Sequence, residues 1–137
     1  MLRRNAIRNA MLFAVASTLL LPGCQTWGPT WSEVTGQQFP TGTITLNRRP
    51  AVIERIDDRG SFASFPVRME PGTRRLVLSA PVRGWAGGSD LEVLMLDAAP
   101  CKRYYVNAQF ADPLGRDWTP VVDFVESIAG CTTVAKQ

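Results

Sequence analysis

The stretch Lys102–Phe110 reads KRYYVNAQF, and its alternation decides the fold. Successive side chains of a β-strand point to opposite faces of a sheet. One face would carry Tyr104, Val106, Ala108 and Phe110, and the other Tyr105, Asn107 and Gln109. The stretch therefore predicts a strand with one tyrosine in the core and the other at the surface.

The next long segment, Asp117–Glu126 (DWTPVVDFVE), permits two interpretations. Thr119 as N-cap and Pro120 at the first helical position would begin a short helix that Gly130 closes, so that 119–129 would be helical. The β-branched and aromatic composition favours a strand instead, in which Pro120 would be confined to an edge or a bulge. The cysteine positions discussed below favour the strand.

The N-terminal residues have the composition of a secretory signal peptide. Met1–Ala10 carries three arginines and no acid, and Met11–Leu21 (MLFAVASTLLL) carries no charge. A run of this length is too short to span a bilayer, which needs roughly 20 apolar residues, but it suits the central region of a signal peptide. We expect residues 1–23 to be a signal-peptide helix that is removed from the mature protein.

The sequence Leu21-Pro22-Gly23-Cys24 resembles the lipobox of bacterial lipoproteins, in which an aliphatic and two small residues precede an obligatory cysteine. Pro22 departs from the commoner pattern. The resemblance implies that Cys24 receives a diacylglyceryl group and becomes the first mature residue. One acyl chain is only a marginal anchor, whereas two or three hold a protein firmly on the membrane. Because residue 25 is Gln and not Asp, the resemblance also implies transfer to the outer membrane, with the domain facing the periplasm.

The three cysteines divide into one lipidated residue and one pair. With Cys24 assigned to the lipid, Cys101 and Cys131 remain as an even pair in an oxidising compartment, and we expect a disulfide between them. Their spacing does not match a zinc site. If 102–110 and 117–127 form a hairpin, opposed residue numbers sum to about 229–232, close to the sum for the two cysteines. The disulfide would then clasp the open end of the hairpin.

The rest of the chain consists of short β-runs between turn signals. Asp57-Asp58-Arg59-Gly60 and Glu70-Pro71-Gly72-Thr73 are turn clusters, the second with Pro and Gly where a type II turn prefers them. We expect residues 24–40 to be a tether between the lipid and the domain. Residues 41–131 would form a single domain, and residues 132–137 a C-terminal tail. We predict an all-β fold, a seven-stranded immunoglobulin- or transthyretin-like β-sandwich.

The order of features in residues 42–126 is similar to the small transthyretin-like or PEGA-type sandwiches of bacterial surface and periplasmic proteins. Ile56–Gly60, Glu70–Leu78 and Tyr104–Ala108 carry this likeness, although the chain lacks the full Pro-Glu-Gly-Ala string. The stretch from Trp118 to Cys131 also resembles the end of small proteobacterial lipoproteins. Neither resemblance implies a catalytic residue.

Charge and residue content exclude several kinds of function. Lys and Arg total 15 and Asp and Glu total 12, but three arginines lie in residues 1–23, so the mature chain is formally neutral at 15 − 3 = 12 bases and 12 acids. We therefore expect no nucleic-acid partner. The chain contains no His, so a Ser-His-Asp or Cys-His site is impossible. We expect no catalytic residue, no metal and no cofactor.

Two groups of carboxylates leave a carboxylate-dependent envelope hydrolase or a calcium site as remote alternatives. They are Glu54, Asp57 and Asp58, and Asp112, Asp117 and Asp123.

Binding is the function class that remains, and few residues are candidates for it. Trp85 lies in the Gly-rich loop 82–90, and Tyr105 is the tyrosine expected at the surface. Three basic pairs could gather into a patch for an anionic headgroup or a glycan, namely Arg48-Arg49, Arg74-Arg75 and Lys102-Arg103. We expect a non-enzymatic, membrane-anchored binding or assembly module whose partner is an envelope protein or the cell wall. The alternative is a lipoprotein that binds a glycan or a small polar ligand at Trp85 or Tyr105.

The lipid anchor can be tested by metabolic labelling with a palmitate analogue. The wild-type protein should incorporate the label, because acylation at Cys24 is what the lipobox directs. The Cys24→Ser variant should incorporate none, whereas Cys101→Ser should label like the wild type. Label that survives in Cys24→Ser would contradict the assignment.

Overall fold

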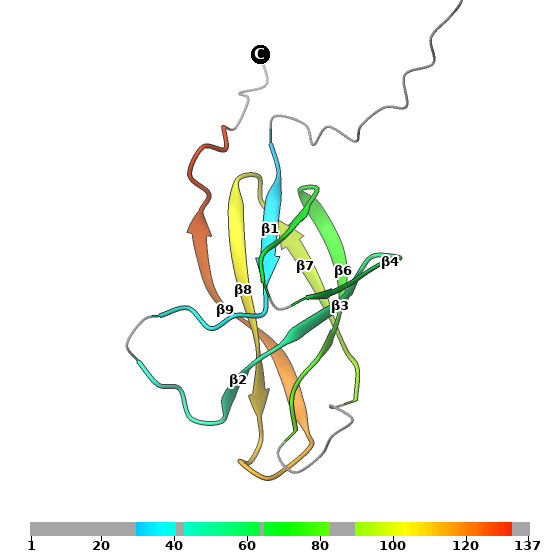
Figure 1. The fold of residues 1–137 in the computed structure, drawn as a ribbon, viewed down its shortest axis with the longest axis vertical. Helices are drawn as coiled ribbons and strands as arrows, with labels where there is room; N and C mark the ends of the chain where they lie inside the picture. The colour runs from blue at the N-terminus through cyan, green and yellow to red at the C-terminus, as the bar shows by residue number, and fades with distance from the viewer. Residues whose placement is uncertain (1–29, 41–42, 64, 83–89, 133–137) are drawn as a thin grey trace, which may run out of the picture.

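The computed structural model describes residues 30–40, 43–63, 65–82 and 90–132 (Figure 1). In these ranges the protein is all-β and contains no helix. No helix able to cross a membrane occurs in this described part. The expected signal-peptide helix at 1–23, Cys24 and Trp85 lie outside it.

Nine strands form within the described residues and make two sheets. They are β1 (Ser32–Thr35), β2 (Arg48–Pro50), β3 (Val52–Ile56), β4 (Arg59–Ala63), β5 (Val67–Met69), β6 (Gly72–Ser79), β7 (Glu92–Ala98), β8 (Lys102–Phe110) and β9 (Trp118–Ser127). Sheet A contains β1, β2, β5, β8 and β9, and sheet B contains β4, β3, β6 and β7 in that order.

The count of nine corrects the prediction of seven strands. The stretch between the two predicted turn clusters divides into two short strands, β4 and β5. The remaining extra strand is β1, which forms inside the expected tether.

The tether predicted for residues 24–40 is wrong at Ser32–Thr35. All four residues of β1 are buried, and β1 lies between β8, to which it runs parallel, and β5. The strand is so short, with Val34 as its one large apolar side chain, that it shows no alternation in the sequence. Gly36 ends it where the chain passes so close to Ala51 that a Cβ would overlap the Ala51 carbonyl oxygen.

Strand β8 pairs along both edges. On one edge β9 runs antiparallel to it from Lys102↔Ser127 to Phe110↔Trp118. The other edge is shared by β1 over residues 103–105 and by β2 over residues 107–109. The strand interpretation of 119–129 is therefore confirmed over most of its length. Pro120 lies in β9, the outer strand of the sheet, as expected for a proline that cannot donate to the ladder.

The core lies between the two sheets and takes side chains from both, as in a β-sandwich. Sheet A contributes Val34, Met69, Tyr104, Val106, Ala108, Phe110 and Trp118, and sheet B contributes Ile53, Ile56, Leu76, Leu78, Leu96 and Ala98. The predicted core face of β8 is thus confirmed, including Tyr104.

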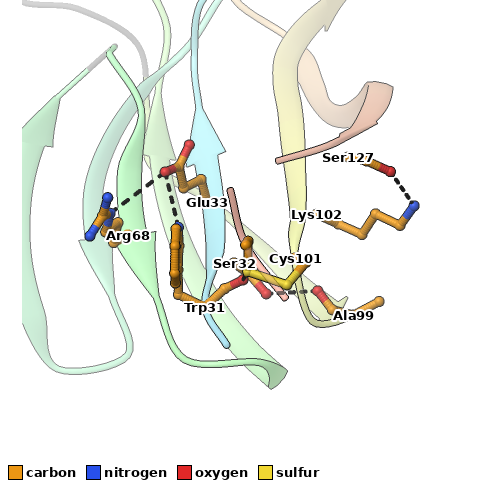
Figure 2. The surroundings of a disulfide bond; sticks show 9 residues. Trp31, Ser32, Glu33, Arg68, Ala99, Cys101, Lys102 and Ser127 are labelled. Atoms are coloured by element: carbon orange, nitrogen blue, oxygen red, sulfur yellow. Dashed lines mark hydrogen bonds and ion pairs between the residues drawn. A yellow bond between two sulfur atoms is a disulfide. The ribbon is translucent and has the colours of Figure 1, made fainter. Parts of the chain in front are cut away.

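The structure joins Cys101 and Cys131 in a disulfide, with 5.4 Å between the Cα atoms (Figure 2). It lies at the open end of the β8–β9 hairpin, as predicted. The cysteines are not directly opposite each other, because the Cys101 carbonyl accepts a hydrogen bond from the Ile128 amide and Cys131 follows in a turn. The amide of Cys101 also donates to the Trp31 carbonyl at 2.8 Å, so the bridge ties the start of β1 to the hairpin.

The double variant Cys101→Ser/Cys131→Ser should lose about 3–4 kcal/mol of unfolding free energy, because the bridge closes a loop between residues 30 positions apart. Urea unfolding without reductant measures this loss. The wild-type protein should unfold like the variant once reductant is added. Free thiols on both cysteines in non-reducing peptide mapping would contradict the pairing.

Candidate functional site

Tyr105 is not at the surface, contrary to the sequence-based expectation. Its exposed fraction is 9%, because Phe39 and Phe124 cover it on the outer face of sheet A. Phe39 stacks on Phe124 with 3.8 Å between ring centroids. The Tyr105 hydroxyl donates to Glu126 at 2.7 Å, and burial raises the pKa of Tyr105. Tyr105 is therefore part of a second small core and does not offer a ring to a ligand.

A buried carboxylate joins three strands beside this aromatic cluster. Glu33 in β1 accepts from Arg103 Nε in β8 at 2.7 Å and lies 3.7 Å from Arg68 Nε in β5. Arg103 also donates to Glu126 in β9 at 2.8 Å. The hydrogen bond to Glu33 raises the pKa of Arg103. All these charges are matched within the sheet, so they stabilise strand order instead of presenting a binding surface.

The three basic pairs do not form one patch. Arg48 pairs with Asp123, and Arg49 lies over the Phe110 ring at 4.1 Å from its centroid. Arg74 pairs with Asp57 on sheet B. The pairs are spread over both sheets, and one residue of each pair (Arg48, Arg74 and Arg103) is in an ion pair, so the expected site for an anionic headgroup or glycan is not assembled.

Four of the six carboxylates that could have served a hydrolase or calcium accept hydrogen bonds within the fold, namely Glu54, Asp57, Asp112 and Asp123. Asp57, at φ 52°, accepts from the Arg75 amide at 3.0 Å and from Arg74 at 3.1 Å, and these bonds lower the pKa of Asp57. Glu54 accepts from the Ser79 hydroxyl, and Asp112 accepts from the Leu114 amide. Within the described ranges, no three His, Cys, Asp or Glu side chains gather as metal ligands do.

A groove with a volume of about 410 Å³ opens between the β3–β4 turn and β5. Its charged lining includes Asp57, Glu70 and Arg74. Arg74 is held by Asp57, by Glu70 and by the Pro71 carbonyl. Asp57, Glu70 and Arg74 are therefore engaged with one another, and the lining also includes Asp58, Arg59 and Arg68.

Strand β7 carries the feature that the sequence reasoning missed. The exposed fraction is 55% for Leu91, which lies just before the strand. It is 46% for Val93 and 60% for Met95, which lie within the strand. They share the outer face of sheet B, while Leu94 and Leu96 face the core. The signal was present in the run Leu91–Leu96, because a run that is apolar on both faces needs cover on both sides.

The free edge of β7 is also regular. Strand β7 pairs with β6 over seven consecutive positions without a bulge, from Gly72↔Ala98 to Leu78↔Glu92. No strand in the described part of the chain pairs with its other edge. Proteins protect such edges with prolines, bulges, charges or short strands.

The other outer strands carry those protections. Strands β2 and β5 have only three residues each, and β2 contains Pro50. Strand β9 contains Pro120 and a bulge at Asp123, opposite the Tyr105–Val106 step. Strand β4 pairs with β3 across an irregular register. Among the described strands, β7 thus presents a long edge with no proline and no bulge, and its charges, Glu92 and Asp97, stand only near its two ends. We take this edge as the candidate functional site.

Comparison of the chain with protein families, with curated proteins and with solved structures finds no match. The site therefore has to be interpreted from its own geometry.

The bonds of Asp57 predict a pH dependence of stability. Its pKa in the folded protein lies below the ordinary value of 3.8. The ionised Asp57 therefore stabilises the fold fully above pH 3.8, and this stabilisation is lost as the pH falls through the pKa of Asp57 in the folded protein. Thermal unfolding between pH 2 and 6 should show this loss in the wild type. It should be smaller in Asp57→Asn, because Asn tolerates the positive φ but carries no charge.

Asp58→Asn is the matched control and should keep the wild-type pH profile, since exposed Asp58 has no ion pair within the described residues. If Asp57→Asn and the wild type lost equal thermal stability between pH 6 and pH 2, the stabilising role of the Asp57 bonds would be contradicted.

Proposed function

We propose that this protein is a lipid-anchored, non-enzymatic binding or assembly module of the bacterial cell envelope, with an immunoglobulin- or transthyretin-like sandwich facing the periplasm from the outer membrane. The observation that carries the binding role is the row of exposed apolar side chains on β7, made by Leu91, Val93 and Met95. The signal-peptide pattern and the lipobox at Cys24 support the location.

The physical reason is the free energy of exposed apolar surface. Contiguous apolar side chains on a soluble domain mark a surface that another molecule covers, and burial of apolar area stabilises the complex by about 25 cal/mol per Å². On β7 these side chains stand on an edge strand, where main-chain groups are also free to pair. A protein partner can satisfy both requirements at once.

The alternative, glycan binding, has less support among the described residues. Glycan sites commonly offer exposed aromatic rings, but Tyr105 and Trp118 are buried and Phe124 is stacked on Phe39. Of the two residues expected to bind a glycan, Trp85 remains a candidate, and it lies outside the described residues.

Site-specific photo-cross-linking in intact envelopes tests the proposal. A photoreactive residue at Met95 should form an adduct with another envelope protein, because Met95 is the most exposed side chain of the apolar row. The matched control is Thr119, which is exposed on sheet A and lies outside the proposed surface. Thr119 should form no such adduct.

Two results would overturn the proposal. Adducts to polysaccharide alone would favour the glycan alternative. The absence of any adduct at Leu91, Val93 and Met95 would remove the binding role from this surface.

A further inference from the structure

The two sheets leave apolar side chains uncovered on the side where β7 and β9 are the outer strands. Val122 and Val125 in β9 lie opposite Val106 and Tyr104, the core-facing residues of β8. They therefore belong to the inner face of sheet A. Nevertheless their exposed fractions are 41% and 42%. Sheet B thus does not extend far enough to cover this part of the inner face.

Strand β7 is the strand of sheet B that comes closest to β9, the strand that carries these residues. It approaches β9 along the open side of the two sheets, and in Figure 1 the two strands diverge toward the top of the view. One more strand beside β7 would lie beneath β9, where Val122 and Val125 are uncovered. It would also shield Leu94, which is only partly buried.

We propose that the partner supplies this strand: an extended peptide segment adds to the free edge of β7 as a fifth strand of sheet B, so that its inward side chains complete the core under β9. This inference rests on the proposed binding function and specifies its mode. The seven residues of β7 offer an edge of about 24 Å. Main-chain hydrogen bonds would provide affinity, and alternate side chains would provide specificity.

The charges of β7 specify the chemistry of that segment. Glu92 and Asp97 stand at the two ends of the strand, and the four residues between them are apolar. Within the described residues, neither Glu92 nor Asp97 forms an ion pair. The nearby Asp90 is exposed, and its Oδ1 lies 3.8 Å from Arg116 Nη2. The complementary segment therefore has an apolar centre with a basic residue at each end.

The same charges disfavour a second copy of this chain as the occupant. If two β7 strands paired antiparallel about the central residue Met95, Glu92 would lie opposite Ala98 and Asp97 opposite Val93. No Lys or Arg occurs between residues 91 and 101, so a second β7 would leave Glu92 and Asp97 without an opposite charge.

Two synthetic peptides test the proposal on the purified full chain. The first contains Lys-Val-Ile-Val-Ile-Lys between soluble Gly-Ser ends, and the second has Glu in place of both lysines. The first should bind, and NMR should show nuclear Overhauser contacts between its backbone and the backbone of β7, as well as contacts with Val122 and Val125. The second should bind at least about tenfold more weakly, since two opposed charge pairs change sign.

The variant Glu92→Lys/Asp97→Lys provides the charge-swap control. It should reverse the preference, so that the glutamate peptide binds more tightly than the lysine peptide. A merely structural effect of the substitutions would weaken both peptides alike. Asp58→Lys, distant from β7 in the sheet order, should leave the preference unchanged.

Several results would overturn strand addition. The first is the absence of backbone contacts between the lysine peptide and β7. The second is contact between β7 and residues 133–137, or another segment of the same chain, in the free protein. The third is a dimer in which two β7 strands pair. If Met95 still cross-linked to an envelope protein in any of these cases, the binding function would stand and only its mode would be wrong.

Discussion

Most residues of β8 are buried, namely Tyr104–Ala108 and Phe110, so the amide and carbonyl groups of this strand need partners on both edges. Strand β9 supplies one whole edge through a short hairpin. The other edge needs two separate segments, β1 at its beginning and β2 at its end. The pairing with β1 brings together Glu33 and Arg103, which are 70 positions apart, and places Val34 in the core. The requirement to pair β8 thus recruits the N-terminal segment into the domain and explains why that segment is not a tether.

The same requirement explains what could be predicted from sequence. Alternation in Lys102–Phe110 and the cysteine pair sufficed for the hairpin and its disulfide, because both are local along the chain. The surface position expected for Tyr105 is wrong because the cover on that face comes from Phe39, which is distant in sequence. Strand β1 could not be predicted because a four-residue parallel strand with one large apolar side chain carries no periodic signal. Its partner residues became apparent only in the fold.

The contrast between the outer strands connects the fold with the candidate site. Where β9 forms the edge, Pro120 and the bulge at Asp123 interrupt the ladder, and Arg48 and Asn107 contact Asp123. Where β7 forms the edge, the ladder is regular and the side chains are apolar on both faces. The sequence run Leu91–Leu96 carried this information, but a buried central strand has the same composition. Only the sheet order distinguishes the two cases.

The central claim is that the domain is complete around β8 and incomplete at β7. Native-state hydrogen exchange on the isolated protein tests this claim most directly, since amides open with free energies that depend on local pairing. The amides of β8 should exchange the slowest, at the rate of global unfolding. The amides of β7 that point away from β6 should exchange orders of magnitude faster. Equal protection of β7 and β8 in the isolated protein would contradict the account, because it would mean that the edge of β7 is already covered.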